Sequence, residues 1–153
     1  MGGSLLFRKF GGKGGDVPAT DVKRLKDISE RLLKAMDEGL VLSCHDCSDG
    51  GLAVSVAEMC ISGQVGAELD LSAMPGDDVN VKLFSESTSR WIAEVDGKDA
   101  DRFTEILGEA ATPIGITKDD ALVVKGTDLD VPVTEMRAAW NDPIWKIMGG
   151  GAQ

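Results

Sequence analysis

Two aspartates, two cysteines, two glycines and a histidine lie together in one short segment of this chain, residues 43–52, which reads Ser-Cys-His-Asp-Cys-Ser-Asp-Gly-Gly-Leu. The pattern indicates the end of a buried strand, a tight turn and the start of an amphipathic helix. Backbone N–H groups at the N-terminus of such a helix have no partners within it, so a phosphate or carboxylate can bind there. Two nearby acids, Asp46 and Asp49, could hold a nucleotide phosphate through a divalent metal ion. The phosphate-binding candidates are Asp46, Ser48, Asp49, Gly50 and Gly51, with Asp46 and Asp49 as the metal ligands.

Each of these residues also has a structural interpretation. Asp49 is a suitable N-cap for the helix, and Asp46 is a suitable turn former.

His45 is the single histidine of the chain. It has either a structural hydrogen-bonding role or that of a general base, and the sequence shows no nucleophile paired with it. The sequence alone leaves these alternatives open.

Cys44 and Cys47 form a C-x-x-C pair, a spacing used in redox motifs and in half of a zinc site. The chain offers one further cysteine, Cys60, and no second histidine. A closed four-ligand site would therefore need Cys60 or a carboxylate. We interpret the pair as small buried thiols beside a turn. Three cysteines, an odd number, do not suggest a disulfide framework, and a reduced cytoplasmic protein is expected.

A second polar run, Ser85-Glu86-Ser87-Thr88-Ser89-Arg90, lies between two apolar stretches. Hydroxyls, a carboxylate and a guanidinium together can bind a phosphate or a sugar. The alternative is a surface loop closed by a salt bridge between Glu86 and Arg90. The binding candidates in this run are Ser85, Glu86, Ser87 and Arg90.

The elements that must position these residues follow from hydrophobic periodicity. Apolar residues at three- and four-residue steps predict a helix over residues 21–38, with Val22, Leu25, Ile28, Leu32 and Met36 on its buried face. Thr20 or Asp21 can cap it and Gly39 ends it. The pattern predicts further helices over residues 52–61 and 99–109. Strands are expected over residues 40–44, 65–71, 79–84, 91–95, 113–116 and 121–125, the last two around a turn at 118–120.

The two ends of the chain are less regular. Residues 2–10 indicate a short strand or extended arm, and the glycine-rich residues 11–15 a flexible loop. A P-loop would need Ser or Thr after Lys13, where this chain has glycine. The tail, residues 134–153, carries Trp140 and Trp145 in a chain with 5% aromatic residues. We expect this tail to dock on a surface of this domain or of a partner.

These elements predict one α/β domain, a single mixed sheet covered by helices. We divide it into an arm and glycine-rich loop (residues 1–20), an α/β core (21–133) and the tail (134–153). The net charge of −10 disfavours nucleic acid and anionic membranes as partners. No apolar run approaches the roughly 18 residues that can span a bilayer.

With these residues in view, the chain resembles the phosphoribosylformylglycinamidine synthase family, synthetase subunit. Residues 44–54, followed by Ala57-Glu58-Met59, are similar to that family's His-Asp-x-Ser-Asp-Gly-Gly-Leu and Ala-Glu-Met signature. Residues 83–90 are similar to its Phe-Ser/Gly-Glu-Ser-x-x-Arg segment, and residues 14–18 and 39–41 also fit. The resemblance runs from about Gly2 to Trp140. Cys47 stands where the family varies, which favours a packing role for it.

The resemblance implies a fold like the C-terminal domain of aminoimidazole ribonucleotide synthetase, here as the last such domain of a longer, internally duplicated enzyme. That enzyme makes formylglycinamidine ribonucleotide from formylglycinamide ribonucleotide, ATP and glutamine-derived ammonia in purine biosynthesis, so ATP or ADP and Mg²⁺ are the implied cofactors. The implied partners are the preceding domains, a glutaminase subunit and a small accessory subunit. The family's catalytic histidine lies in those preceding domains, so this chain is expected to be a fragment that is inactive alone. The resemblance implies that Asp46 and Asp49 contact metal or nucleotide. The 85–90 loop corresponds to the substrate loop of the first repeat, and in the second repeat its role is either ligand binding or structural.

Two alternatives remain from the sequence. One is a domain of another ATP-dependent enzyme of the same superfamily, such as a selenophosphate synthetase-like or hydrogenase-maturation protein. These usually carry Arg or Thr where this chain has Ser48 and Asp49. The other is a non-enzymatic interaction module that recruits a partner through Trp140 and Trp145.

Overall fold

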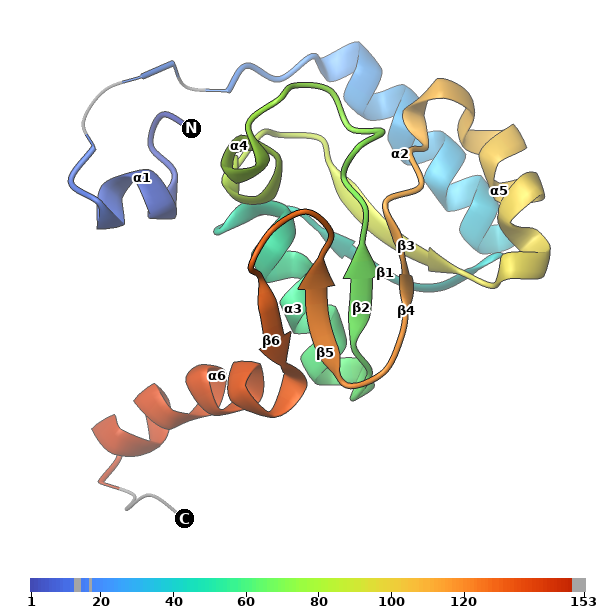
Figure 1. Cartoon of the computed structure of the whole chain (residues 1–153). Coiled ribbons are helices and arrows are strands. Elements are labelled where there is room, and N and C mark those ends of the chain that lie inside the picture. The colour runs from blue at the N-terminus through green and yellow to red at the C-terminus, as the bar shows by residue number, and fades with distance from the viewer. Residues whose placement is uncertain (13–14, 17, 150–153) are drawn as a thin grey trace. The chain divides into compact units, whose positions relative to one another are not determined.

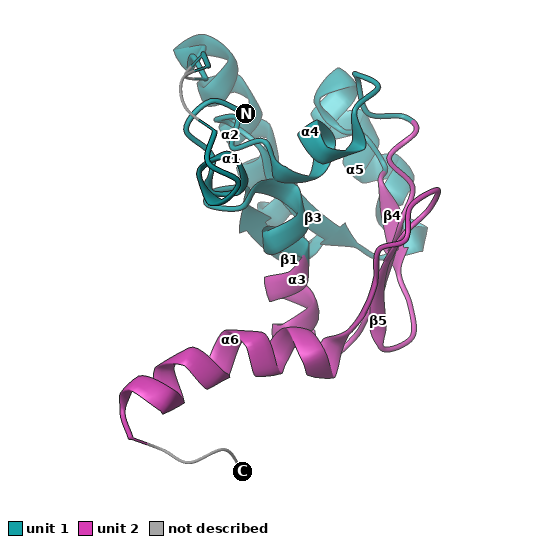
Figure 2. Ribbon diagram, turned by 60° about the vertical axis from the view of Figure 1, so that its left-hand side comes forward, with its two compact units in different colours: residues 1–56, 73–113 teal, residues 57–72, 114–153 magenta. Residues whose placement is uncertain are grey.

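The computed structural model describes residues 1–12, 15–16 and 18–149 (Figure 1). The chain divides into two compact units, residues 1–56 with 73–113 and residues 57–72 with 114–153 (Figure 2). Each unit is described by itself. Helices and a mixed sheet are present, so the predicted α/β class is confirmed. The predicted division into arm, core and tail stays a prediction.

The first unit contains the two-stranded antiparallel sheet that carries the candidate motifs. β1 (Val41–Asp46) pairs with β3 (Trp91–Val95), and Asp46 lies opposite Trp91 at one end of the ladder. The helices of this unit are α1 (Leu5–Lys9), α2 (Val22–Asp37), α4 (Val79–Phe84), α5 (Ala100–Leu107) and the first part of α3 (Gly51–Gly63). Two short 3₁₀ turns, Gly97–Asp99 and Gly108–Ala110, flank α5.

A hydrophobic core joins α2 to α5 in this unit. It is built from Leu32, Ala35, Leu40, Ile106 and Leu107. The predicted helix over 21–38 is confirmed, and its cap is Asp21, whose carboxylate accepts the N–H groups of Lys23 and Arg24 at 3.0 and 3.1 Å. The predicted buried face of this helix is wrong near both ends of the helix, because the side chains of Val22 and Met36 are exposed. Ala35, which is fully buried, takes the packing position instead.

The second unit holds a four-stranded sheet in the order β4-β2-β5-β6, covering Gly115–Thr117, Ala67–Leu69, Ala121–Val124 and Asp130–Pro132. β2 is parallel to β5 and antiparallel to β4. The buried side chains of this sheet alternate along β2 and β5, namely Ala67, Leu69, Leu122 and Val124. That alternation confirms the predicted strand at 65–71, although the paired part is shorter.

The expected strands near 113–116 and 121–125 are confirmed as β4 and β5, with β2 between them in the sheet. Two other expectations about the strands are wrong. The strands form two sheets and not one. Residues 79–84 form the helix α4, where Asp78 caps the first turn by accepting the N–H of Asn80 at 2.8 Å. A good N-cap thus outweighed the strand preference of the valines and the phenylalanine in this stretch.

Both chain ends are more helical than expected. Residues 5–9 form α1 in place of a strand, because the buried Ser4 caps the helix by accepting the N–H of Phe7. In the glycine-rich loop, Lys13 and Gly14 lie outside the described residues.

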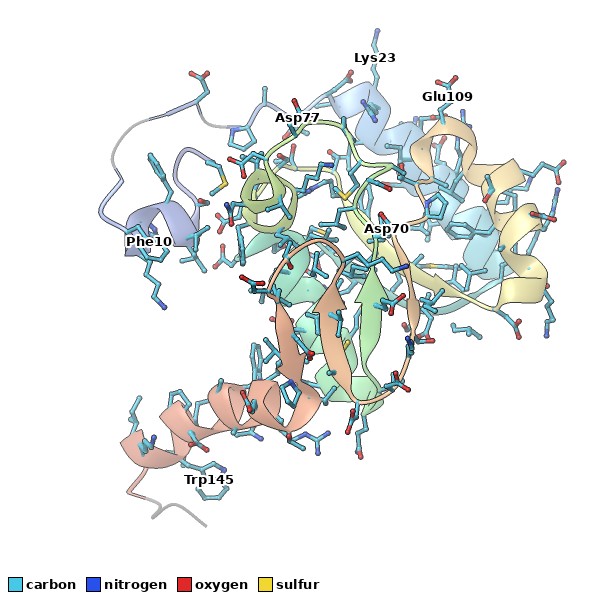
Figure 3. The ribbon with its side chains drawn as sticks, viewed as in Figure 1. Phe10, Lys23, Asp70, Asp77, Glu109 and Trp145 are labelled. Carbon is cyan, nitrogen blue, oxygen red and sulfur yellow. The ribbon has the colours of Figure 1, made fainter. Side chains whose placement is uncertain are left out.

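The tail forms α6 (Val133–Ile147), and its Trp140 and Trp145 are 54% and 63% exposed (Trp145 is labelled in Figure 3). Docking of the tail stays a prediction. Among the described helices, none has both the length and the apolar character to cross a membrane.

Candidate functional site

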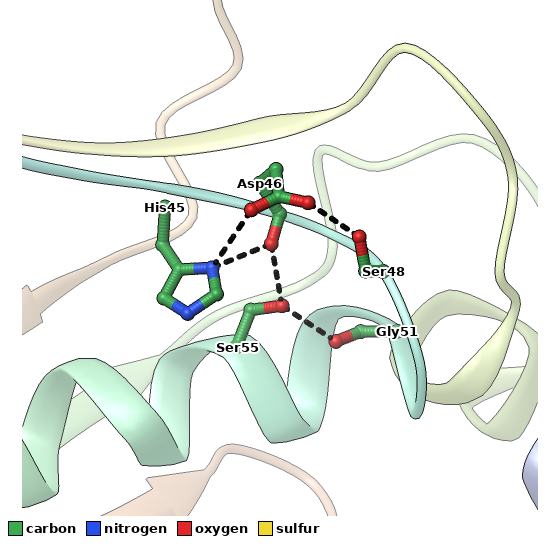
Figure 4. Close-up of polar contacts among 5 residues, drawn as sticks. All are labelled: His45, Asp46, Ser48, Gly51 and Ser55. Atoms are coloured by element: carbon green, nitrogen blue, oxygen red, sulfur yellow. Dashed lines mark hydrogen bonds and ion pairs between the residues drawn. The ribbon is translucent and has the colours of Figure 1, made fainter.

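The acidic turn after β1 is held by a set of short polar contacts (Figure 4). The Asp46 carboxylate accepts a hydrogen bond from the Ser48 hydroxyl, and its other oxygen lies 3.5 Å from His45 Nδ1. The Asp46 carbonyl lies 2.6 Å from His45 Nδ1 and accepts the Ser55 hydroxyl at 3.0 Å. Ser55 Oγ also lies 3.0 Å from the Gly51 carbonyl. Ser55 on α3, which the sequence analysis did not single out, therefore joins the two ends of the turn.

Asp46 is an ionised and accessible carboxylate. The Ser48 hydroxyl, a backbone N–H and the nearby His45 lower the pKa of Asp46 in that order of importance. Its side chain is 63% exposed. Asp46 can therefore offer negative charge to a cation or a metal-bound ligand at neutral pH.

The Gly50-Gly51 pair lets the turn approach the second motif closely. Both glycines have positive φ, +80° and +66°. A Cβ atom on Gly51 would lie 2.6 Å from the Ser85 carbonyl oxygen and 2.9 Å from that of Leu83. Glycine is needed here both for the left-handed conformation and for the contact with the neighbouring backbone.

The loop over residues 85–90 is fastened to this turn by backbone and side-chain bonds. The Cys47 N–H donates to the Arg90 carbonyl at 2.9 Å, and the Gly50 N–H donates to Glu86 Oε1 at 2.9 Å. Within the loop, the Arg90 guanidinium donates to the Ser85 carbonyl. Among the ion pairs of the described residues there is none between Glu86 and Arg90, so the alternative of a loop closed by that salt bridge is wrong. Each of the two side chains bonds to a backbone group.

The two motifs together line one cavity of about 550 Å³. Predicted candidates that line it are Asp46, Ser48, Asp49, Glu86, Ser87 and Arg90. Three further candidates, Gly50, Gly51 and Ser85, are not among its lining residues and contribute through the backbone contacts above. Four further residues of the wall were not among the predicted candidates, namely Cys47, Thr88, Ser89 and Trp91.

Two buried donors in this cavity wall lack partners. Among the described residues, Ser89 Oγ and Arg90 Nε are buried without a hydrogen bond. Leaving a buried polar group unpaired costs about 1–3 kcal/mol, so such atoms mark places where a ligand or water completes the bonding. Ser89 also has φ +62°, an uncommon conformation for a residue other than glycine. No sequence signal distinguishes it from Ser85, Ser87 and Thr88, the other hydroxyl residues of the loop.

The cavity wall carries both positive and negative side chains, which suits a ligand that has groups of both charges. Arg90 brings a permanent positive charge and an unpaired donor. Asp46, Asp49 and Glu86 bring carboxylates. A phosphate accompanied by a divalent cation satisfies both, because the phosphate takes the guanidinium and the cation takes the carboxylates of Asp46 and Asp49.

The carboxylates alone do not make a complete metal site. Among the described residues, no group of three or more His, Cys, Asp or Glu side chains is placed to hold a metal ion. Magnesium is usually bound by one or two carboxylates together with substrate phosphates and water. The pair Asp46 and Asp49 fits that mode and does not fit a cage made wholly of protein.

The thiols near the turn have a packing environment. Cys47 and Cys60 are buried and Cys44 is partly buried, and all three are free. Burial raises the pKa of Cys47, and burial together with the Asp46 charge raises that of Cys44. Raised values keep both thiols protonated at neutral pH, so neither has the thiolate character of a redox or zinc-ligating cysteine.

A smaller cavity of about 280 Å³ lies in the second unit, beside β2 and β5. Glu68 pairs there with Lys118 at 3.0 Å and with Lys125 at 3.1 Å. The two lysines lower the pKa of Glu68. Both lysines therefore already have a carboxylate partner, and this smaller cavity is a weaker candidate site for an anionic ligand than the first cavity.

Comparison with known families identifies the family of this chain. The family described as "AIR synthase related protein, C-terminal domain" matches residues 1–126. The chain belongs to this family. Both motifs that line the cavity lie within the matched residues.

Two curated relatives in this family are subunits called "Phosphoribosylformylglycinamidine synthase subunit PurL". The protein from Anaeromyxobacter dehalogenans is 36% identical over 94% of this chain. The protein from Parafrankia sp. is 36% identical over 99% of this chain. The chain covers 20% of each relative. It therefore spans about a fifth of the length of these proteins.

Solved structures share the family's fold. Thermotoga maritima PurL complexed with FGAR matches with a TM-score of 0.70 and 22% identity, over 79% of this chain and 22% of that one. The hydrogenase maturation protein HypE matches with a TM-score of 0.56 and 18% identity, over 84% of this chain and 47% of that one. At these identities the likeness shows the fold alone.

Proposed function

We propose that this chain is the C-terminal domain of a phosphoribosylformylglycinamidine synthase. In that enzyme, formylglycinamide ribonucleotide, ATP and glutamine-derived ammonia yield formylglycinamidine ribonucleotide, an ATP-dependent amidine-forming C–N ligation in purine biosynthesis. The two curated relatives at 36% identity support this assignment. The catalytic groups would come from other domains of the enzyme, and this domain would be inactive alone.

The cavity between the acidic turn and the 85–90 loop is, in this proposal, a nucleotide-phosphate site. One observation carries it: the loop that brings Arg90 lies against the turn that brings Asp46, and two donors of the loop are buried without partners. Arg90, Ser89 and Ser87 would donate to phosphate oxygens. Ser85 positions Arg90 through its carbonyl oxygen. Solved Thermotoga maritima PurL structures complexed with ATP and ADP make a nucleotide the natural candidate.

Asp46 and Asp49 are the residues that would hold Mg²⁺. When bound, the cation neutralises phosphate charge. The task of the chain is then to present two ionised carboxylates beside a guanidinium, so that the phosphate is attracted from one side and its counter-cation from the other. The hydrogen bond from Ser48 keeps Asp46 deprotonated and oriented for this role.

The partners in this proposal are the preceding domains of the same enzyme, a glutaminase subunit and a small accessory subunit. A solved Thermotoga maritima structure of PurLQS supports such an assembly. The cytoplasm is the compartment expected of a purine biosynthetic enzyme. Nucleic acid and membrane are not proposed partners, given the net charge of −10.

The test places substitutions in the full-length enzyme that carries this segment. Asp46→Ala and Arg90→Ala are compared with Asp77→Ala, an exposed acid outside the cavity. We expect weaker binding of Mg-ADP in the first two variants and unchanged binding in the third, measured by calorimetry beside ammonia-dependent amidine formation. Equal Mg-ADP affinity in all three variants would refute the site, and absence of amidine formation by the unaltered enzyme would refute the reaction.

A further inference from the structure

Glu86 is bonded in a way that sets it apart from the other carboxylates of the cavity. Its Oε1 atom accepts the N–H of Gly50 at 2.9 Å and the N–H of Leu5 at 2.8 Å. Gly50 belongs to the acidic turn, and Leu5 is the first residue of α1. One carboxylate oxygen therefore joins the turn to the N-terminal arm.

Both of these hydrogen-bond partners of Glu86 are backbone groups of the protein. A carboxylate that accepts two backbone N–H groups makes charge-assisted hydrogen bonds, which are about twice as strong as neutral ones. Leu5 is at the start of a helix, where its N–H has no partner within the helix. The Ser4 hydroxyl accepts the N–H of Phe7 in the same turn. Ser4 and Glu86 together thus satisfy donors at the beginning of α1.

The arm meets the same loop at a second place. The Thr20 hydroxyl donates to Thr88 Oγ1 at 3.1 Å, and the Thr88 hydroxyl donates to the Ala19 carbonyl at 3.4 Å. The arm therefore contacts the loop at Glu86 and again at Thr88, the residues on either side of Ser87. Both contacted residues line the cavity.

We propose that Glu86 is a positioning residue and not a ligand of the bound phosphate or cation. It couples the docking of the N-terminal arm to the geometry of the Gly50-Gly51 turn, so that a docked arm keeps the turn in its binding conformation. The consequence for ligand affinity rests on the function proposed above, whereas the coupling between arm and turn does not.

The first experiment measures amide hydrogen exchange at Leu5 and Gly50 by NMR. Glu86→Ala removes the acceptor and is expected to accelerate exchange at both amides by about tenfold or more. Glu86→Gln keeps an acceptor oxygen and is expected to restore protection. Glu109→Ala, an exposed acid outside the cavity wall, is the matched control. Acceleration at only one of the two amides, or Gln behaving like Ala, would overturn the proposal.

A second variant tests the coupling if Glu86→Ala does not fold. Leu5→Pro removes the N–H donor and also replaces the leucine side chain, which is 40% exposed, at a helix position where proline is well accepted. The preceding Ser4 is already extended, with ψ 154°, as a residue before proline prefers. We expect faster exchange at Gly50 in this variant, although Gly50 itself is unaltered. Unchanged exchange at Gly50 would contradict coupling through Glu86.

The ligand measurement separates this proposal from the proposed function. Mg-ADP is titrated into the full-length enzyme carrying Glu86→Gln or Glu86→Ala. A positioning role predicts near-normal affinity for Gln and at least about tenfold weaker affinity for Ala. Equally weak binding by both variants would make Glu86 a charged ligand and overturn the proposal. If the unaltered enzyme binds no Mg-ADP, the nucleotide site fails, while the exchange results still decide the role of Glu86.

Discussion

Asp46 lies directly opposite Trp91 in the antiparallel pair formed by β1 and β3. The chain leaves β1 through the acidic turn at Asp46, and it enters β3 from the 85–90 loop at Trp91. Because the two strands run in opposite directions, this single pairing brings both motifs to the same end of the ladder. The register of β1 on β3 is thus the structural cause of the candidate site.

The first prediction concerns the close approach at Gly51. Gly51→Ala meets both a positive φ and two backbone carbonyls, at 2.6 and 2.9 Å from the added Cβ. Gly76→Ala is the matched control, since Gly76 has φ +88° and open space around it. We expect the control to lose about 1 kcal/mol of unfolding free energy, and Gly51→Ala to lose about 1–3 kcal/mol more because of the clash. Urea denaturation measures both, and equal losses would contradict the tight contact between turn and loop.

The second prediction separates the charge of Arg90 from its geometry. Arg90→Lys keeps the positive charge but has no planar group that can contact the Ser85 carbonyl and also offer Nε. We expect Arg90→Lys to weaken Mg-ADP binding by about 1–2 kcal/mol, nearly as much as Arg90→Ala. Calorimetric titration of the full-length enzyme gives these values. A lysine variant with full affinity would show that charge alone suffices.

The third prediction concerns Ser89. Its buried hydroxyl has no partner among the described residues, so removing it costs no protein hydrogen bond. Ser89→Ala should therefore leave urea stability within about 0.5 kcal/mol of the original, while weakening Mg-ADP binding by about 1 kcal/mol. A variant that loses stability and keeps affinity would assign the hydroxyl to the fold and not to the site.

The fourth prediction follows from the raised pKa of Cys47. Since burial raises this pKa, the folded protein holds the thiol proton at pH values where the unfolded chain, with a pKa of about 8.5, releases it. The contribution to stability is complete below the unfolded pKa and is lost as the pH rises toward the folded pKa. We expect the free energy of unfolding to fall between pH 7.5 and about 9.5, less steeply in Cys47→Ala. Identical slopes for the two proteins would show that Cys47 does not titrate differently on folding.

The fifth prediction tests the exposed face of α6. Trp140 and Trp145 are 54% and 63% exposed, whereas Trp91 in the cavity wall is partly buried. Acrylamide should therefore quench the fluorescence of Trp140 and Trp145 more strongly than that of Trp91. Variants with a single tryptophan, each other one replaced by Phe, resolve the three signals. Strong protection of the α6 tryptophans in the isolated chain would show that the tail docks on its own surface.

Local sequence signals predicted an element correctly where that element has its own capping residue and a clear hydrophobic periodicity. The helix from Val22 is marked by Asp21, a clear apolar face and Gly39. The alternation of Ala67, Glu68 and Leu69 marked β2. The same signals misjudged α4, because valines and a phenylalanine favour a strand while the Asp78 cap favours a helix. A strong cap close to a short apolar run deserves more weight than the propensity of that run.

The candidate site was only partly predictable from the sequence, and the reason differs from the one that applies to α4. The two motifs were visible as separate groups of polar residues, but their meeting depends on the long-range register between β1 and β3, which no local pattern encodes. The same holds for Ser55, which closes the turn from one turn into α3, and for Leu5, which reaches Glu86 from the N-terminal arm. The left-handed conformation of Ser89 has no marker in the sequence either.

The most direct test of the central claim is calorimetric titration of this chain with Mg-ADP, beside Asp46→Ala and the matched control Asp77→Ala. If the acidic turn and the 85–90 loop form a nucleotide-phosphate site, the unaltered chain and the Asp77 variant bind with the same affinity and the Asp46 variant binds at least tenfold more weakly, a loss of about 1.4 kcal/mol. Equal affinity in all three proteins would contradict a site built on Asp46. Absence of heat with all three would contradict a site that this domain forms alone, and the same titration of the full-length enzyme would follow.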